Sequence, residues 1–229
     1  MTAWSNYWKD LPQSPEESSD QLRIGRTENK IAVTDERWQL TVKKVIHELN
    51  IESSSRVLDL AGGNALFSRN LKMRDGLTVC ADISHSLLLE AQEYSTNPVE
   101  CDIRSLPFSS GSFDRVVIYA AVQYLQENDA VLLLKRCREI LTPTGKIFIG
   151  DIPDTSARFR YFDDVERRKA YFNSINSSRP LIGTWFSRDW FAYALEFAGF
   201  RNTRILDQSE WEPYKKFRFD AIAQCQKVT

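Results

Sequence analysis

The sequence has little histidine, little glycine and no paired cysteines, and each shortage excludes a class of protein. Only His47 and His85 are present among 229 residues, which argues against a histidine-based metal site, and we predict that no metal is bound. The four cysteines are scattered without a C-x-x-C pair, which predicts reduced thiols and neither a disulfide framework nor a zinc site. Nine glycines and eight prolines are too few for a collagen-like or disordered chain.

The chain also lacks an excess of either charge and lacks long apolar runs. Lys and Arg together number 30 against 31 Asp and Glu, a balance that disfavours a nucleic-acid partner. No segment approaches the ~18 apolar residues of a membrane-spanning helix. The first residues show no basic region followed by an apolar stretch, so we predict no signal peptide. These features predict a cytoplasmic protein with neither a membrane nor a nucleic acid as partner.

The composition, 42% hydrophobic and 27% charged, is that of one globular domain with a modest extension. Residues 1–34 are polar and irregular and form the predicted N-terminal extension. The domain is predicted over residues 35–229, beginning with an amphipathic helix from Asp35. Residues 152–184 are charged and aromatic, and they are predicted as an insertion of helix and loop.

Apolar segments alternate with helical patterns through the middle of the chain. Five strands are predicted, at 56–60, 77–81, 99–101, 113–120 and 146–150. The connections carry helical patterns, one of them running from Gly63 to about Met73 and another starting with Ser84 as N-cap. A helix at 190–200 and strands at 201–206 and 218–223 follow. Continuous apolar strands joined by helices predict an α/β fold with a parallel sheet covered on both faces.

Acidic and small residues stand at the predicted carboxyl ends of these strands, where parallel sheets bind ligands. The first strand runs into Asp59-Leu60-Ala61-Gly62-Gly63, and the next two end at Asp82 and Asp102. Asp82 lies 20 residues beyond Gly62, the position at which an acid binds ribose hydroxyls and disfavours NADP. The loop reads A-G-G-N-A and the Walker pattern is absent, so a dinucleotide and ATP are both disfavoured.

Four segments, VLDLAGGNALFS, ADIS, CDIRSLPFSSGSFDRVVIYAAVQYL and REILTPTGKIFIGD, resemble in order and spacing the class I S-adenosylmethionine-dependent methyltransferases of small molecules. The similarity covers residues 40–150 well and 187–226 loosely. It implies a Rossmann-like, doubly wound, mostly parallel seven-stranded sheet with a C-terminal antiparallel hairpin. It also implies S-adenosylmethionine as cofactor and S-adenosylhomocysteine as product.

The resemblance implies a set of cofactor-binding residues. Asp59 would lie under the methionine end and orient its ammonium, Asp82 would take the ribose hydroxyls, and Asp102 would accept from the adenine amino group. The full set that it implies is Asp59, Ala61, Gly62, Asp82, Ile83, Asp102, Ile103 and Tyr119.

The loop departs from the family where glycine is usual and this chain has Ala61 and Ala65. Two extra methyl groups fit if both residues keep a negative φ. The cofactor would then lie slightly differently, or bind more weakly.

To transfer an activated methyl group, a protein must align the methyl group with the acceptor and remove water from around them. For an oxygen acceptor it must also remove a proton. Asp151 follows the fifth predicted strand and faces the presumed acceptor, so we predict it as the catalytic base, with Tyr119 as a second catalytic candidate. His85 would fall on the cofactor side and is predicted to start a helix.

Acceptor contacts are predicted for five residues, Tyr7, Arg26, Tyr124, Arg158 and Arg160. Arg26, in the segment I-G-R-T, could reach a carboxylate, and the extension that carries it would act as a lid or simply pack on the core. Arg158 and Arg160 would hold an anionic group, with a solvated helix face as the alternative.

The predicted function is O-methylation of a small acceptor, neutral or anionic, such as a sugar, a nucleotide or a secondary-metabolite intermediate. Two alternatives remain, a C-methyltransferase acting on a quinone or lipid precursor and a catalytically silent cofactor-binding protein. An RNA or protein methyltransferase is disfavoured by the charge and by Tyr119-Ala120-Ala121-Val122, which stands where an N/D-P-P-Y motif would be.

Overall fold

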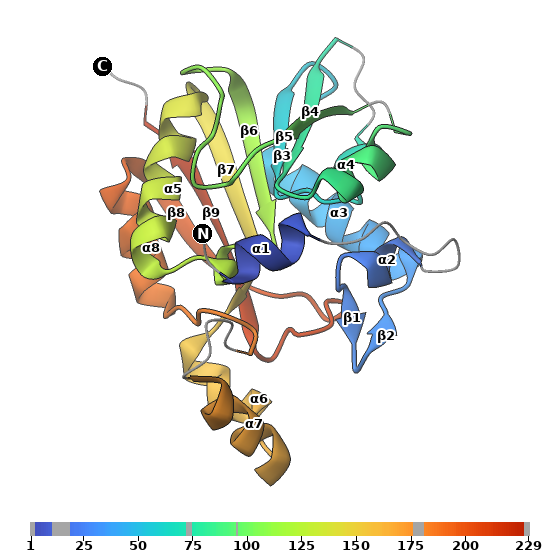
Figure 1. Ribbon diagram of the computed structural model, residues 1–229. Helices are drawn as coiled ribbons and strands as arrows, with labels where there is room; N and C mark the ends of the chain where they lie inside the picture. Colours follow the sequence, from blue (N-terminus) through green and yellow to red (C-terminus); the bar gives the residue numbers. More distant parts are fainter. Residues whose placement is uncertain (1–2, 11–18, 72–74, 95, 176–180, 227–229) are drawn as a thin grey trace.

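A seven-stranded sheet with the order β5-β4-β3-β6-β7-β9-β8 forms the centre of the molecule (Figure 1). This computed structural model describes residues 3–10, 19–71, 75–94, 96–175 and 181–226. Neighbours from β5 to β7 pair in parallel, and β9 is antiparallel to both β7 and β8. The strands are β3 (Arg56–Leu60), β4 (Leu77–Asp82), β5 (Asn97–Glu100), β6 (Phe113–Tyr119), β7 (Leu141–Pro153), β8 (Phe200–Asp207) and β9 (Arg218–Cys225). The predicted α/β fold with a C-terminal hairpin is confirmed.

Helices cover both faces of this sheet because its strands are apolar on both sides. On one face α3 (Asp35–Leu49) packs Trp38, Val42 and Val45 against Val117 and Phe148, and α4 (His85–Ala91) covers Cys80 nearby. On the other face, α5 (Glu127–Ile140) and α8 (Arg188–Phe197) pack on the residues that alternate with these along the strands. The predicted helix from Asp35 is confirmed.

The predicted helix from Gly63 to about Met73 is wrong within the described residues. The chain there forms turns and a short 3₁₀ segment, Ser68–Asn70. The condition of a negative φ at the two loop alanines is not met, because Ala61 has φ 58° and Ala65 has φ 61°. A left-handed residue cannot continue a right-handed helix, so Ala65 interrupts the helical pattern that its neighbours show.

The extension and the insertion both lie at the end of the sheet where the parallel strands finish (Figure 1). The extension contains α1 (Ala3–Lys9), α2 (Asp20–Arg23) and a small hairpin of β1 (Thr27–Glu28) and β2 (Ile31–Ala32) that the sequence did not predict. The insertion forms α6 (Arg158–Tyr161) and α7 (Val165–Ile175), which project away from the sheet.

The helices of the described segments are all too short or too polar to cross a membrane. All four cysteines lie in the described segments, and each is a free thiol.

Candidate active site

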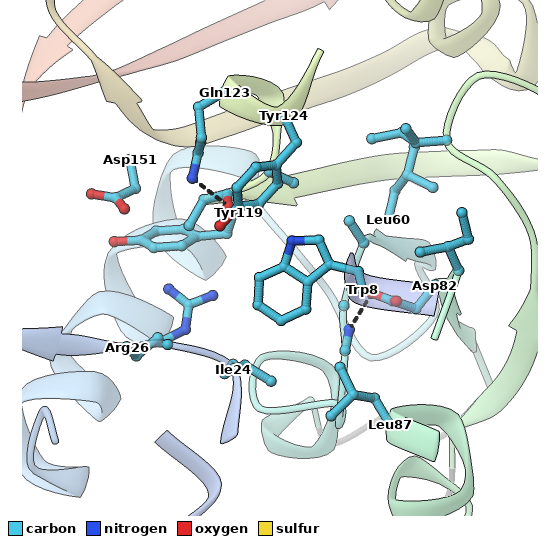
Figure 2. A pocket seen from close by; sticks show the side chains of 18 of the residues that line it. Trp8, Ile24, Arg26, Leu60, Asp82, Leu87, Tyr119, Gln123, Tyr124 and Asp151 are labelled. Atoms are coloured by element: carbon cyan, nitrogen blue, oxygen red, sulfur yellow. Dashed lines mark hydrogen bonds between the residues drawn. The ribbon is translucent and has the colours of Figure 1, made fainter. Parts of the chain in front are cut away.

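A pocket opens at the carboxyl ends of β3, β4 and β6, and Trp8 of helix α1 forms part of its lining (Figure 2). Its wall includes the loop after β3, the residues after β4 and β5, the end of β6, and a segment between β8 and β9. Figure 2 shows the Trp8 indole in the middle, with Asp82 and Leu87 on one side and Arg26, Tyr119 and Asp151 on the other. The parallel strands thus bring residues from distant parts of the sequence to one cavity, as expected for this fold.

The loop after β3 packs closely on the strands behind it because it carries glycine at Gly62. A Cβ on Gly62 would lie 2.7 Å from Asp59 Cγ and 2.8 Å from Cys80 Sγ, so no larger residue fits there. Asp59 lies behind this loop, is 2% exposed, and accepts a hydrogen bond from Ser68 N at 3.1 Å. Burial raises the pKa of its carboxyl to about 6.

The acids after β4 and β5 are held firmly by their own loops. Asp82 accepts hydrogen bonds from Gly63 N at 2.9 Å and Ser84 N at 2.8 Å, and burial raises its pKa. Asp102 pairs with Arg104, whose hydrogen bond lowers the pKa of the carboxyl. Both line the pocket, so each carboxylate has a fixed orientation there before any ligand arrives.

Left-handed backbone conformations cluster around the pocket. Besides Gly63, the non-glycine residues Ala61 (φ 58°), Ala120 (φ 55°) and Asp151 (φ 61°) all line it. Such conformations cost an L-residue about 1–2 kcal/mol each, and they persist where the surrounding structure enforces them. The strain lies at the carboxyl ends of three strands, where the wall must turn sharply.

Ala61→Gly is therefore expected to stabilise the protein by about 1 kcal/mol, or 2–4 °C in Tm. Glycine removes the left-handed penalty, and the greater freedom of the unfolded chain offsets only part of that gain. Urea denaturation of this variant and of Ala198→Gly, where φ is −74°, provides the measurement and its control. A loss of stability in Ala61→Gly equal to that of the control would contradict the strain assignment.

Arg26 lies in a corner between two aromatic rings. Its guanidinium is 4.2 Å from the Trp38 ring centre and 4.4 Å from that of Tyr119, and the two rings are perpendicular. Burial lowers the pKa of the guanidinium, an effect that the charges of Asp151 and Asp59 oppose, but neither of these carboxylates is within ion-pair distance of it. The cation is instead held by the faces of the two rings.

The Tyr119 hydroxyl points away from the pocket centre into a buried polar network. It donates to Glu212 Oε1 at 3.1 Å, and Lys44 Nζ lies 2.7 Å from Glu212 Oε2 and 2.6 Å from Asp220 Oδ2. Burial, together with Glu212, raises the pKa of Tyr119 well above its usual range. Tyr119 therefore presents its ring to the pocket, while its proton is committed to Glu212.

Asp151 borders this network at the point where the pairing of β7 with β9 shifts register, between Ile149 and Ile152. Its backbone N–H donates to Asp220 Oδ1 at 2.9 Å, and Oδ1 of its own side chain accepts from Gln208 Nε2 at 3.1 Å. Arg218 donates to the Asp151 carbonyl at 2.7 Å and lies 3.4 Å from its Oδ2. These contacts fix the carboxylate at the edge of the pocket.

Most of the residues predicted for the site line this one pocket. They are Arg26, Ala61, Gly62, Asp82, Ile83, Asp102, Ile103, Tyr119, Tyr124 and Asp151. Asp59 lies directly behind the wall, and Tyr7 stands outside it, 42% exposed, with its ring 5.2 Å from that of Trp8.

Arg158 and Arg160 lie outside the pocket lining, on the projecting insertion. Arg158 donates to the Tyr171 hydroxyl at 3.0 Å and lies near the ring of Trp185. Its described contacts are therefore with the insertion and with the residue that directly follows it.

Several pocket residues were not predicted from the sequence. Trp8 lines the pocket from the extension, whereas the sequence predicts its neighbour Tyr7 as the acceptor contact. The others that carry polar or aromatic groups include Trp38, Gln123, Trp211, Tyr214 and Arg218. The polar stretch between the last two strands gave no signal that would have separated Trp211 and Tyr214 from an ordinary surface loop.

Comparison with known proteins finds relatives of the segment that carries part of this pocket. Residues 58–149 match the methyltransferase domain family. The chain is 26% identical over 117 residues to a demethylmenaquinone methyltransferase of Corynebacterium glutamicum, covering 51% of this chain and 49% of that protein. It is 25% identical over 169 residues to a malonyl-[acyl-carrier protein] O-methyltransferase of Geobacter sulfurreducens, covering 69% and 60%. The chain thus spans only about half to three fifths of the length of these relatives.

Solved structures show the same fold at low sequence identity. A methyltransferase of Methanosarcina mazei described as SAM-dependent superposes with a TM-score of 0.63 at 16% identity, covering 80% of this chain and 98% of that one. One from Leishmania major gives 0.66 at 18% identity, covering 96% and 80%. The arrangement of sheet and helices is therefore shared well beyond the segment matched in sequence.

Proposed function

Because the chain belongs to the class I S-adenosylmethionine-dependent methyltransferases, we propose that it transfers a methyl group from S-adenosylmethionine to an oxygen of a small acceptor. The observation that carries the proposal is that the glycine loop, Asp82 and Asp102 all line the same pocket. The acceptor atom is inferred from the nearby carboxylate of Asp151.

The residues on the Asp82 side of the pocket suit a nucleoside that carries a positive charge. Asp82 would hold the ribose hydroxyls, and Asp102 the adenine amino group, between the apolar side chains of Ile83 and Ile103. Gly62 lets the loop backbone lie directly against Asp59 and Cys80, and the buried carboxyl of Asp59 behind it would favour the ammonium. S-adenosylmethionine supplies an activated methyl group when bound, so the chain itself must align the acceptor and accept its proton.

Asp151 is the residue proposed to accept that proton. Its carboxylate lines the pocket and is fixed by Gln208 and Arg218, so it can receive a hydroxyl proton without first moving. Tyr119 is proposed to shape the site through its ring, because its hydroxyl already donates to Glu212. Tyr124 would contact the acceptor from the same side (Figure 2).

The extension is proposed to close the pocket. Trp8 from α1 lines it and lies 5.6 Å from the Tyr124 ring, so α1 must move or stack on the ligands when they bind. The neighbouring Tyr7 would take part through this movement. The four free thiols support the further proposal that the protein is cytoplasmic.

Asp82→Ala is expected to weaken S-adenosylhomocysteine binding by about 2 kcal/mol, roughly 30-fold, because it removes a charged acceptor of two hydrogen bonds. Calorimetric titration measures the effect, and a thermal melt reports whether loss of the bonds to Gly63 and Ser84 has loosened the loop. Asp75→Ala, which removes an exposed acid, is the matched control. Equal affinities in the two variants would argue against a ribose role for Asp82.

Turnover tests the proposed reaction itself. The protein is incubated with S-adenosylmethionine and a panel of hydroxylated acceptors, and mass spectrometry follows S-adenosylhomocysteine and the methylated product. O-methylated product, with a lower rate in Asp151→Asn, is the expected result. Cofactor binding without product from any acceptor would favour the silent binding protein.

C-methylation of a quinone or lipid precursor is the second candidate. It is favoured by the relatives named as demethylmenaquinone and ubiquinone/menaquinone biosynthesis methyltransferases, the latter 28% identical over 155 residues in Xanthomonas oryzae. The aromatic side chains of the insertion suit such a molecule, and Arg158 and Arg160 would contact a part of it that extends beyond the pocket. Product bearing the methyl group on carbon would decide for this candidate.

A further inference from the structure

Arg26 is the charged side chain of the pocket whose described surroundings leave it without an anionic partner. Its Nε is buried and makes no hydrogen bond, and its guanidinium forms no ion pair with a described residue. By contrast, Arg218 is paired with Asp151, and Asp102 is paired with Arg104. A buried cation without an anion carries a desolvation cost that a ligand anion would relieve.

The contacts that Arg26 does make leave its hydrogen-bonding edge available. The Trp38 and Tyr119 rings lie against the guanidinium at 4.2 and 4.4 Å, and these contacts fix its plane. A guanidinium held in this way can donate parallel hydrogen bonds from its edge to a carboxylate. Trp211 adds a second unpaired donor, because its indole N–H is buried without a partner and the residue lines the same pocket.

The position of Arg26 separates it from the side of the pocket proposed for the nucleoside. Figure 2 shows Arg26 beneath Tyr119, on the side of Asp151, with the Trp8 indole between it and Asp82. The Asp82 side carries acids and suits a cation, whereas the Arg26 side has an unpaired positive charge. The rings of Tyr124, Trp211 and Tyr214 also line the pocket and offer flat apolar surfaces.

We propose that Arg26 and Trp211 form a carboxylate site and that the acceptor is a small aromatic carboxylate. The inference rests on the proposed function and adds to it the class of the acceptor. The ring of the acceptor would pack on the aromatic wall, its carboxylate on Arg26, and its reactive hydroxyl toward Asp151. Methyl transfer then forms an O–CH₃ bond at that hydroxyl, breaks the S–CH₃ bond of S-adenosylmethionine to leave the neutral thioether, and passes the hydroxyl proton to Asp151.

The test is calorimetric titration of 4-hydroxybenzoate and its amide, 4-hydroxybenzamide, into the full chain, with and without S-adenosylhomocysteine. The carboxylate is expected to bind at least tenfold more tightly than the amide. Arg26→Gln should lower its affinity about 10- to 100-fold, since a charge-assisted bond is lost, and Trp211→Phe by less. Trp211→Phe removes one N–H and keeps the ring, so it remains informative if Arg26→Gln is poorly folded.

Lys216→Gln is the control. It removes an exposed positive charge from the segment between β8 and β9 that also carries Trp211, and Lys216 does not line the pocket. Equal affinity for the acid and the amide, or equal losses in Arg26→Gln and Lys216→Gln, would overturn the proposal. So would an Arg26→Gln variant that loses affinity for S-adenosylhomocysteine but not for 5′-methylthioadenosine, since the carboxylate on Arg26 would then be the cofactor's own. Failure of the wild type to bind S-adenosylhomocysteine would instead count against the proposed function, while the titration without it still tests the carboxylate site.

Discussion

Lys44→Met is expected to lower the free energy of unfolding by about 3–5 kcal/mol, because it leaves two buried carboxylates without their cation. Glu212 and Asp220 are 2% and 0% exposed, and the Lys44 ammonium lies within hydrogen-bonding distance of both. The Met side chain fills the space of the aliphatic stem but cannot compensate either charge. Guanidinium denaturation at pH 8 measures the loss.

Two comparisons separate this charge effect from a packing effect. Lys43→Met changes an exposed lysine of the same helix and should be close to neutral. Lowering the pH should reduce the deficit of Lys44→Met, because burial, assisted by Glu212, raises the pKa of Asp220 to about 6 even with Lys44 present. A deficit that is the same at pH 5 and pH 8, or is matched by Lys43→Met, would show that the carboxylates are not its cause.

Asp59→Asn is expected to change how stability depends on pH, by up to about 3 kcal/mol between pH 4 and pH 8. The Asp59 carboxyl ionises near 3.8 in the unfolded chain and near 6 in the folded protein, mainly because it is buried. The folded state therefore keeps its proton to a higher pH, and the free energy of unfolding falls as the pH rises through this interval. The asparagine side chain has no such titration and can still accept the bond from Ser68 N.

The difference in unfolding free energy, variant minus wild type, should accordingly rise between pH 4 and pH 8 and level off above the folded pKa. Urea denaturation at five pH values measures it, with Asp75→Asn as an exposed control that should show no rise. A flat difference for Asp59→Asn would mean that the buried carboxyl costs the folded state nothing. The proposed role in orienting an ammonium gives a reason for placing an acid where it lowers stability at neutral pH.

The sheet could be predicted from the sequence because its signals are local. Strands such as Arg56–Leu60 and Leu77–Asp82 are mostly apolar segments, the first followed by a glycine loop and the second ending in an acid, and parallel packing brings such ends together. Asp82, Asp102 and Gly62 could therefore be assigned to one pocket without knowledge of any contact. Their surroundings in the structure agree with that assignment.

The features that were missed depend on tertiary structure. The left-handed conformations of Ala61 and Ala65 are imposed by their surroundings against the preference of alanine. The sequence therefore predicted a helix that includes Ala65. Tyr7 and Trp8 are adjacent on a short helix, and the choice between them depends on how α1 lies on the sheet. Trp211 reaches the pocket only because β8 and β9 pair as they do, far along the chain from Arg26.

The most direct test of the central claim is calorimetric titration of S-adenosylmethionine into the wild-type protein. We expect saturable binding at one site per chain, with an affinity that is weakened in Asp82→Ala and unchanged in Asp75→Ala. Absence of binding by a folded wild-type protein would contradict it.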